Sequence, residues 1–147
     1  MQLVISPRAP NPRRVTNGVE ASRVAMILAI LERRAGVKLS DKDVYVSTVG
    51  GVRLAEPAAD LAIAIAVASA LHDFAVPHEV AAVGELSLAG EIRPVTMAAQ
   101  RRGEATRLGY KTIVDADAGT LDPSIKQVKA LAARAVGHAK LRDIPEF

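Results

Sequence analysis

A short segment in the first half of the chain has the arrangement in which enzymes often place reactive groups. In GGVRLAEPAADL, residues 50–61, a Gly-Gly turn precedes Pro57, Ala58, Ala59 and Asp60, and a long apolar run follows. A helix that begins after a glycine turn presents free backbone amides, so its start suits a nucleophile or an anion. Two of these four residues are alanines and one is proline, so the segment could equally be the plain beginning of a buried helix.

Other motifs that would carry chemistry are missing from the sequence. Neither GxxxxGK[ST] nor GxGxxG occurs, so we expect no ATP hydrolysis by this chain alone. There are no cysteines, and His72, His78 and His138 lack the spacing of metal ligands. We therefore expect no metal site and no cofactor within this chain.

Length and composition are typical of one globular domain. Of the 147 residues, 50% are apolar and 24% are charged, which suffices for a core without disulfides. We expect a single domain over 1–147, with a strand and a Pro/Arg-rich segment at 1–17 and the core at 18–147. No segment resembles a signal peptide, and the apolar run 61–71 is too short to cross a bilayer. These features predict a cytoplasmic protein without a membrane partner.

The charge pattern permits contact with nucleic acid through phosphates. The formal net charge is +3, and aromatic residues make up 3% of the chain, so few rings could stack on bases. The candidates for DNA contact are Arg8, Arg13 and Arg14 in RAPNPRR, and Arg33 and Arg34 at the end of a predicted helix. An interdomain or intersubunit contact is the alternative for RAPNPRR. For Arg33, Arg34 and Lys38, and for Arg101, Arg102 and Arg107, the alternative is a solvated helix face.

Two helices should form the framework that positions these residues. Apolar residues at helical spacing predict a helix over 18–35, with Asn17 and Glu20 as a capping box. The run 57–71 alternates large and small residues as a strand might. Its alanines, Pro57 in the first turn and Asp60 near the positive end of the dipole favour a helix, and a helix that is apolar all round is a buried one.

The remaining segments interleave strands and helices. We expect strands at 2–6, 43–49 and 80–88, a hairpin into 91–93, a helix capped by Thr96 and ending near 108, a strand at 111–114, a loop at 115–124, a strand at 127–132 and a helix at 134–141. This order predicts an α/β or α+β fold with a mixed sheet and packed helices.

The hairpin GELSLAGEIRPV, residues 84–95, is followed by a helix and by LGYKTIV, and this order resembles the proteolytic domain of Lon proteases. The chain is more similar still to the RadA/Sms family of bacterial DNA repair ATPases, whose C-terminal domain is Lon-like. The matching segments include PRRVTNGVEASRVAMILAILERRAG and DKDVYVSTVGGVRLAEPAADLAIAIAVASAL, and they extend over residues 12 to about 114. The resemblance implies the Lon proteolytic-domain fold, which is related to the ribosomal-protein domain 2-like superfold.

The Lon resemblance also locates a catalytic dyad and shows that it is incomplete. Ala58 stands in place of the nucleophilic serine, and Ala99, or Gln100 after a slip of one residue, stands in place of the lysine. Asp60 replaces a glycine of the Lon pattern. An alanine methyl group can neither attack nor accept a proton, so we expect that this domain is not an enzyme. The alternative is a serine peptidase with a displaced site, at Ser69 or Thr96.

The resemblance to the RadA family further implies a role. It suggests a non-catalytic domain that serves as a hexamerisation scaffold and contacts DNA in homologous recombination and branch migration, together with the recombinase machinery. ATP, Mg²⁺ and zinc would bind to N-terminal parts that lie outside these 147 residues.

Overall fold

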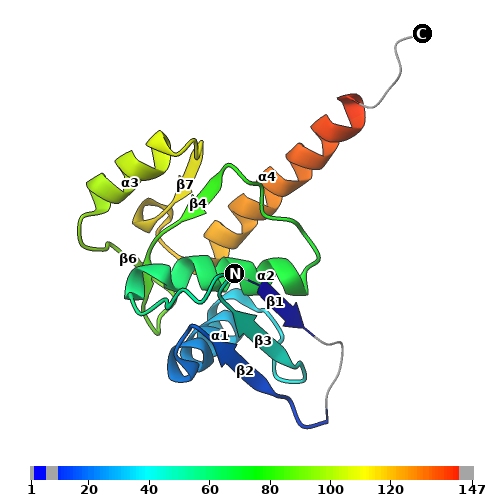
Figure 1. Ribbon diagram of the computed structural model, residues 1–147. Helices are drawn as coiled ribbons and strands as arrows, with labels where there is room; N and C mark the ends of the chain where they lie inside the picture. Colours follow the sequence, from blue (N-terminus) through cyan, green and yellow to red (C-terminus); the bar gives the residue numbers. More distant parts are fainter. Residues whose placement is uncertain (1, 6–9, 143–147) are drawn as a thin grey trace.

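The computed structural model of the protein describes residues 2–5 and 10–142 and shows a mixed α/β fold in layers (Figure 1). Helix α2, Asp60–Leu71, crosses the centre and directly follows a 3₁₀ turn, η1, Pro57–Ala59. On one side of α2 lie β1 (Gln2–Ile5), β2 (Arg14–Asn17), α1 (Ala21–Ala35) and β3 (Val44–Ser47). The other elements are β4 (Val80–Ala82), β5 (Glu85–Leu86), β6 (Ile92–Arg93), α3 (Ala98–Arg107), β7 (Thr112–Val114), η2 (Ala116–Ala118) and α4 (Leu121–Arg142).

The strands form small separate sheets in the described part of the chain. In the three-stranded sheet the order is β1-β3-β2, with β1 antiparallel and β2 parallel to β3. Strands β4 and β7 pair in parallel, and β5 and β6 form the predicted hairpin. The predicted α/β class is therefore confirmed, whereas the expected strand 80–88 is divided between two sheets at Val83 and Gly84.

The central helix α2 is buried on nearly all sides, as its composition predicts. Leu61, Ile63, Ile65 and Val67 are each at most 3% exposed. They share one core with apolar residues of α1, β3 and α4. Burying each side chain of this size stabilises a fold by about 1.5–3 kcal/mol. The apolar run 61–71 is thus the centre of the core.

Helix α1 begins later than predicted. Asn17 belongs to β2, which pairs with β3, and the helix starts at Ala21 with Glu20 at the N-cap and without a side-chain capping bond. The predicted capping box is therefore wrong, because strand pairing with a distant segment takes Asn17. Thr96 does not cap α3 either, since Met97, with φ 58°, occupies the N-cap position.

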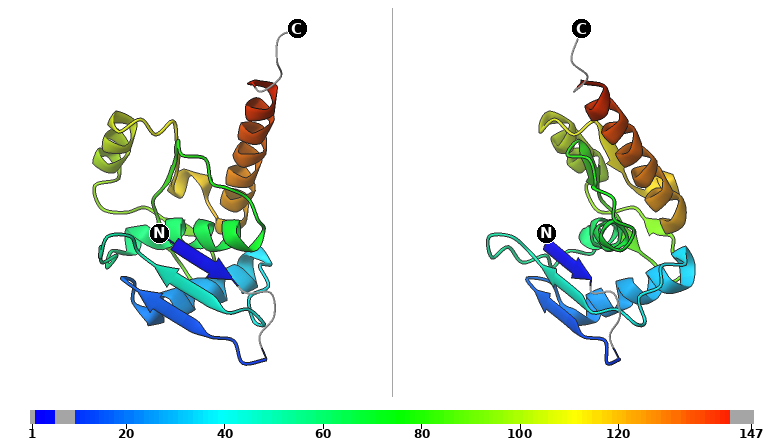
Figure 2. Two further views of the ribbon diagram at one scale, coloured as in Figure 1. Left: turned by 45° about the vertical axis from the view of Figure 1, so that its right-hand side comes forward. Right: turned by 90° about the vertical axis from the view of Figure 1, so that its right-hand side faces the viewer.

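The C-terminal region differs most from the sequence prediction. The predicted loop at 115–124 contains η2 and the start of α4, and the predicted strand at 127–132 lies inside α4. Leu121, Ile125, Val128 and Ala132 are buried and recur at intervals of three or four residues. This is the spacing of one helix face. Beyond Ala132 the helix extends away from the other elements (Figure 2).

One ion pair connects three elements of the core. Asp60, in the first turn of α2, is 0% exposed. Its carboxylate accepts two hydrogen bonds from Arg23 of α1, at 2.6 Å from Nε and 3.0 Å from Nη2. It also accepts a bond of 3.2 Å from the backbone amide of Leu86 in β5. A buried carboxylate is tolerated because charge and hydrogen bonds are both supplied.

We predict that Arg23→Met lowers the free energy of unfolding by about 3–5 kcal/mol, because it leaves the Asp60 charge buried without its partner. Urea denaturation of the 147-residue chain would measure this. The matched control is Arg107→Met, which removes an exposed pair with Glu104 and should leave the free energy of unfolding nearly unchanged, because solvent screens such a pair. Equal effects of the two substitutions would contradict a central role for the buried pair.

A second prediction concerns Gly18, which connects β2 to the start of α1. Its φ is +78°, and a Cβ there would meet the Thr48 hydroxyl and lie 2.6 Å from the Val52 carbonyl oxygen. Gly36 has a similar φ of +65° but open space around it. Gly36→Ala should therefore cost about 1 kcal/mol of backbone strain, and Gly18→Ala clearly more, in a thermal unfolding comparison. Equal losses would exclude the steric contribution.

Candidate functional site

The two positions that correspond to the Lon dyad lie in different surroundings. Ala58 lies in η1, is 8% exposed, and its carbonyl accepts a hydrogen bond of 2.9 Å from the Gly84 amide. Ala99 lies on α3 and is exposed, as is Gln100. The alanine side chains offer no hydroxyl and no amine, so they supply neither a nucleophile nor a base.

The hydroxyls considered for a displaced site can also be located. Ser69 Oγ donates a hydrogen bond of 2.6 Å to the Phe74 carbonyl. Thr96 is exposed, and its carbonyl accepts a bond of 3.0 Å from Arg101 Nε. Ser69 thus bonds to the backbone just beyond its own helix, in keeping with a core hydroxyl rather than an activated nucleophile.

A cavity of ≈ 260 Å³ opens beside the Arg23–Asp60 pair. It is lined by Gly18, Val19, Glu20, Arg23, Arg53, Leu54 and Ala55. The hydrogen bond to Asp60 raises the pKa of Arg23, and the smaller effect of burial opposes this rise. Because Asp60 neutralises Arg23, and Glu20 offsets Arg53, the walls carry no clear excess of positive charge. Sequence reasoning missed this cavity, since its walls come from two segments, 18–23 and 53–55, that lie far apart in the chain.

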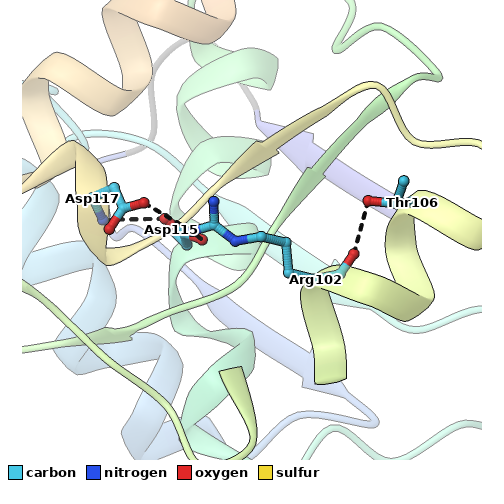
Figure 3. Close-up of polar contacts among 4 residues, drawn as sticks. All are labelled: Arg102, Thr106, Asp115 and Asp117. Carbon is cyan, nitrogen blue, oxygen red and sulfur yellow. Dashed lines mark hydrogen bonds and ion pairs between the residues drawn. The ribbon is translucent and has the colours of Figure 1, made fainter. Parts of the chain in front are cut away.

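Helix α3 is attached to the rest of the molecule through charged side chains. Arg102 reaches across to Asp115 and Asp117, which flank and form η2, with 2.9 Å between Arg102 Nη2 and Asp117 Oδ2 (Figure 3). Arg101 pairs with Glu56, just before η1, at 2.5 Å. The hydrogen bond to Asp117 is the largest cause of the raised pKa of Arg102. Two of the three arginines considered as a solvated helix face therefore tie α3 to neighbouring segments.

The five candidates for DNA contact have different surroundings. Arg8 lies outside the described residues. The Arg14 guanidinium donates to the carbonyls of Lys42 and Leu39, the latter at 2.7 Å, so it closes the loop that precedes β3. Arg13 is exposed, and its backbone amide rather than its side chain bonds to Asp43, at 2.7 Å.

The other two candidates, Arg33 and Arg34, lie in the last turn of α1. Helix α1 runs back alongside β2, so its end returns toward the start of that strand (Figure 2). The bond from Arg14 to Leu39 connects the two places. Arg13 just before β2, Arg33 and Arg34 at the end of α1, and Lys38 just beyond it are all exposed, and we call this set of cations the basic end.

The carboxylates near the basic end have partners of their own. Glu32 accepts a hydrogen bond from the Leu39 amide at 2.8 Å, and Asp41 pairs with Lys42 at 3.1 Å. Among residues 2–5 and 10–142, no carboxylate pairs with the side chains of the basic end, so these cations are available for an anionic partner. Within residues 2–5 and 10–142, no group of three or more acidic or histidine side chains is placed to hold a metal ion.

Comparison with known proteins relates this arrangement to a family. The model of the family described as "Subunit ChlI of Mg-chelatase" matches residues 16–118. This range extends from β2 through η2 and includes the Arg23–Asp60 pair, the hairpin and α3.

Several bacterial proteins with the name "DNA repair protein RadA" are similar to the chain. The protein of Mycolicibacterium smegmatis is 45% identical over 136 residues, which is 92% of this chain and 29% of that protein. The protein of Halalkalibacterium halodurans is 44% identical over 80% of this chain and 26% of its own length. The Escherichia coli protein is 44% identical over 71% of this chain and 23% of its own length. The chain thus spans about a quarter of the length of these relatives.

These findings correct the expectation about enzymatic activity, and the structure bears on the expectation that the chain has no membrane partner. The expectation that the domain is not an enzyme is wrong, because the matching model describes a subunit of an enzyme and the relatives are far longer proteins to which such a segment belongs. In the described part of the chain, no helix combines the length and the apolar character needed to cross a membrane. The match over residues 16–118 shows that the chain belongs to the family described as subunit ChlI of Mg-chelatase, and its relatives include the DNA repair proteins RadA.

Proposed function

We propose that the chain is a DNA-contacting and self-associating module of a larger, ATP-dependent DNA repair protein. The observation that carries this proposal is the 45% identity, over 92% of the chain, to a protein named for DNA repair. In this proposal the module works in the cytoplasm during recombination and branch migration, with the recombinase machinery. ATP, Mg²⁺ and zinc are bound by regions outside these 147 residues.

The basic end is the surface that best suits DNA. Arg13, Arg33, Arg34 and Lys38 are exposed there, and the nearby carboxylates are engaged with backbone amides or with Lys42. Contacts of arginine and lysine with phosphates provide affinity without reading the sequence. Among the described residues the exposed rings are few, which favours phosphate contacts at most of this surface.

Helix α3 supports the proposal of self-association into a ring, with six copies as the expected number. None of its side chains is buried, and Met97 and Leu108 at its two ends are 65% and 62% exposed. A helix of ten residues is marginal in water unless a partner covers it, and its two arginine ties supply little stabilisation at exposed positions. A second copy of the chain would cover this face.

The same interpretation includes a Lon-like architecture. The order of buried helix α2, hairpin β5–β6 and helix α3 is the order in which the resemblance to Lon proteases places them. In this proposal Ala58, in η1 just before α2, and Ala99, on α3, occupy the two dyad positions of that resemblance. Asp60, in place of a glycine, makes the ion pair with Arg23.

For DNA contact, we predict that Arg13→Ala with Lys38→Ala weakens duplex binding and makes it less sensitive to salt. Each lost phosphate contact should lower the slope of log K against log salt by about 0.9. Fluorescence anisotropy over a series of salt concentrations would measure both. Lys126→Ala with Lys129→Ala removes the same charge from α4 and should leave the slope unchanged. An unchanged slope in the first variant would exclude these two residues from the DNA surface.

For self-association, we predict that the chain sediments as more than one copy and that Met97→Ser with Leu108→Ser shifts it toward the monomer. Burial of exposed apolar side chains drives association, so their loss should raise the dissociation constant at least about tenfold. Analytical ultracentrifugation over a concentration series would test this. A purely monomeric chain at the highest concentration would contradict self-association of the isolated module.

A further inference from the structure

The tip of the β5–β6 hairpin and the last turns of α1 enclose a groove. Its cavity of ≈ 330 Å³ is lined by Ala29, Ile30, Arg33, Arg34 and Leu88. Leu88, at the tip, is 71% exposed. The groove therefore combines two guanidinium groups on one wall with a large aliphatic side chain on the other.

The hairpin tip is held firmly in place. The Gly90 amide donates a hydrogen bond of 2.9 Å to the Ser87 carbonyl, and the Ser87 amide donates one of 3.0 Å to the Glu91 carbonyl. The Gly90 carbonyl accepts a hydrogen bond of 2.9 Å from the Leu121 amide at the start of α4. Leu88 thus lies on a fixed turn, so a contact with it requires little ordering of the backbone.

Gly90 also sets how closely the hairpin approaches α1. It is buried with φ +84°, and a Cβ there would lie 2.8 Å from the Cβ of Arg34. Arg34 Nε makes a long contact of 3.4 Å with the Leu88 carbonyl. The absence of a side chain at Gly90 is therefore what lets the hairpin tip stand beside the two arginines.

The charge of the groove is positive. Arg33 is exposed, and its side chain has no partner among the residues that the structure describes. Glu32, its neighbour on α1, bonds to the Leu39 amide, and Glu91 on the hairpin accepts from Ser87 Oγ at 3.4 Å. An occupant should therefore be anionic on the side of α1 and apolar or flat on the side of Leu88.

We propose that this groove binds one unstacked nucleotide of single-stranded DNA, with its phosphate on Arg33 and Arg34 and its base against Leu88. The cavity lies at the lower end of the range of about 300–1,000 Å³ that is usual for small-ligand pockets, which suits one nucleotide. Duplex DNA would offer its phosphates to the arginines, but its stacked bases would leave the Leu88 wall without a partner. An unstacked base exposes its flat face, and contact of that face with Leu88 would remove apolar surface from water. This proposal rests on the proposed DNA contact. It adds that the DNA is single-stranded and that Leu88 contacts the base.

The test compares a fluorescein-labelled oligo-thymidine with a duplex of the same length, by anisotropy on the 147-residue chain. Leu88→Ser should weaken single-strand binding about fivefold, the loss of one apolar contact, and leave duplex binding within about twofold. Arg33→Ala should lower the single-strand salt slope by about 0.7. The control variants are Val136→Ser, an exposed apolar residue of α4, and Arg107→Ala, an exposed cation of α3. Neither should change single-strand affinity, and thermal unfolding would verify that every variant is folded.

The outcomes separate this proposal from the broader one. If Leu88→Ser leaves single-strand binding unchanged, or weakens single-strand and duplex binding equally, the nucleotide groove is overturned while DNA contact stands. The groove would then suit an acidic protein segment better. If the unaltered chain binds neither probe, DNA contact itself is overturned, and the groove proposal with it.

Discussion

The bidentate pair between Arg23 and Asp60 is the interaction on which the arrangement of the core depends. Asp60 begins the buried helix α2 and is itself inaccessible to solvent. A carboxylate in this position would be strongly destabilising without a charged partner and further hydrogen bonds. Arg23 brings the charge from α1, and the Leu86 amide brings a hydrogen bond from β5. One side chain therefore sets the relative positions of α1, α2 and the β5–β6 hairpin.

The surfaces assigned to binding follow from that constraint. The hairpin is held at the end of β5 by Asp60 and at its tip by Leu121, and Gly90 lets it approach Arg34 closely. The wall of the groove that the hairpin forms is thus tied to α2 and α4 by hydrogen bonds. Helix α3 is different, because Arg101 and Arg102 tie it to Glu56, Asp115 and Asp117 without burial of its side chains. Ion pairs at exposed positions stabilise weakly, which leaves the face of α3 suited to a partner.

Much of the fold could be predicted where local composition decides it. The alanines and Pro57 predict the helix that became η1 and α2, and apolar spacing predicts α1. Predictions were wrong where contacts between distant segments of the chain decide the secondary structure. Asn17 lies in a strand because β3 is beside it, and 127–132 is helical because one face of α4 packs on the core. The six residues 127–132 are too few to show the buried face of α4. The regular spacing of apolar residues from Leu121 to Ala132 does show it.

The sequence by itself determined the α/β class, the buried central helix, the hairpin and, through resemblance, the kinship with DNA repair proteins. These depend on residues that are neighbours in the chain or share a regular period. The tertiary structure alone decided that Asp60 pairs with Arg23 and that the end of α1 faces Leu88. It also decided that the Arg14 side chain bonds to Leu39, while the Arg13 side chain has no partner within the described residues. Each of these depends on which distant segments meet. Such meetings arise from packing of the whole core, because the partners lie tens of residues apart and no local pattern links them.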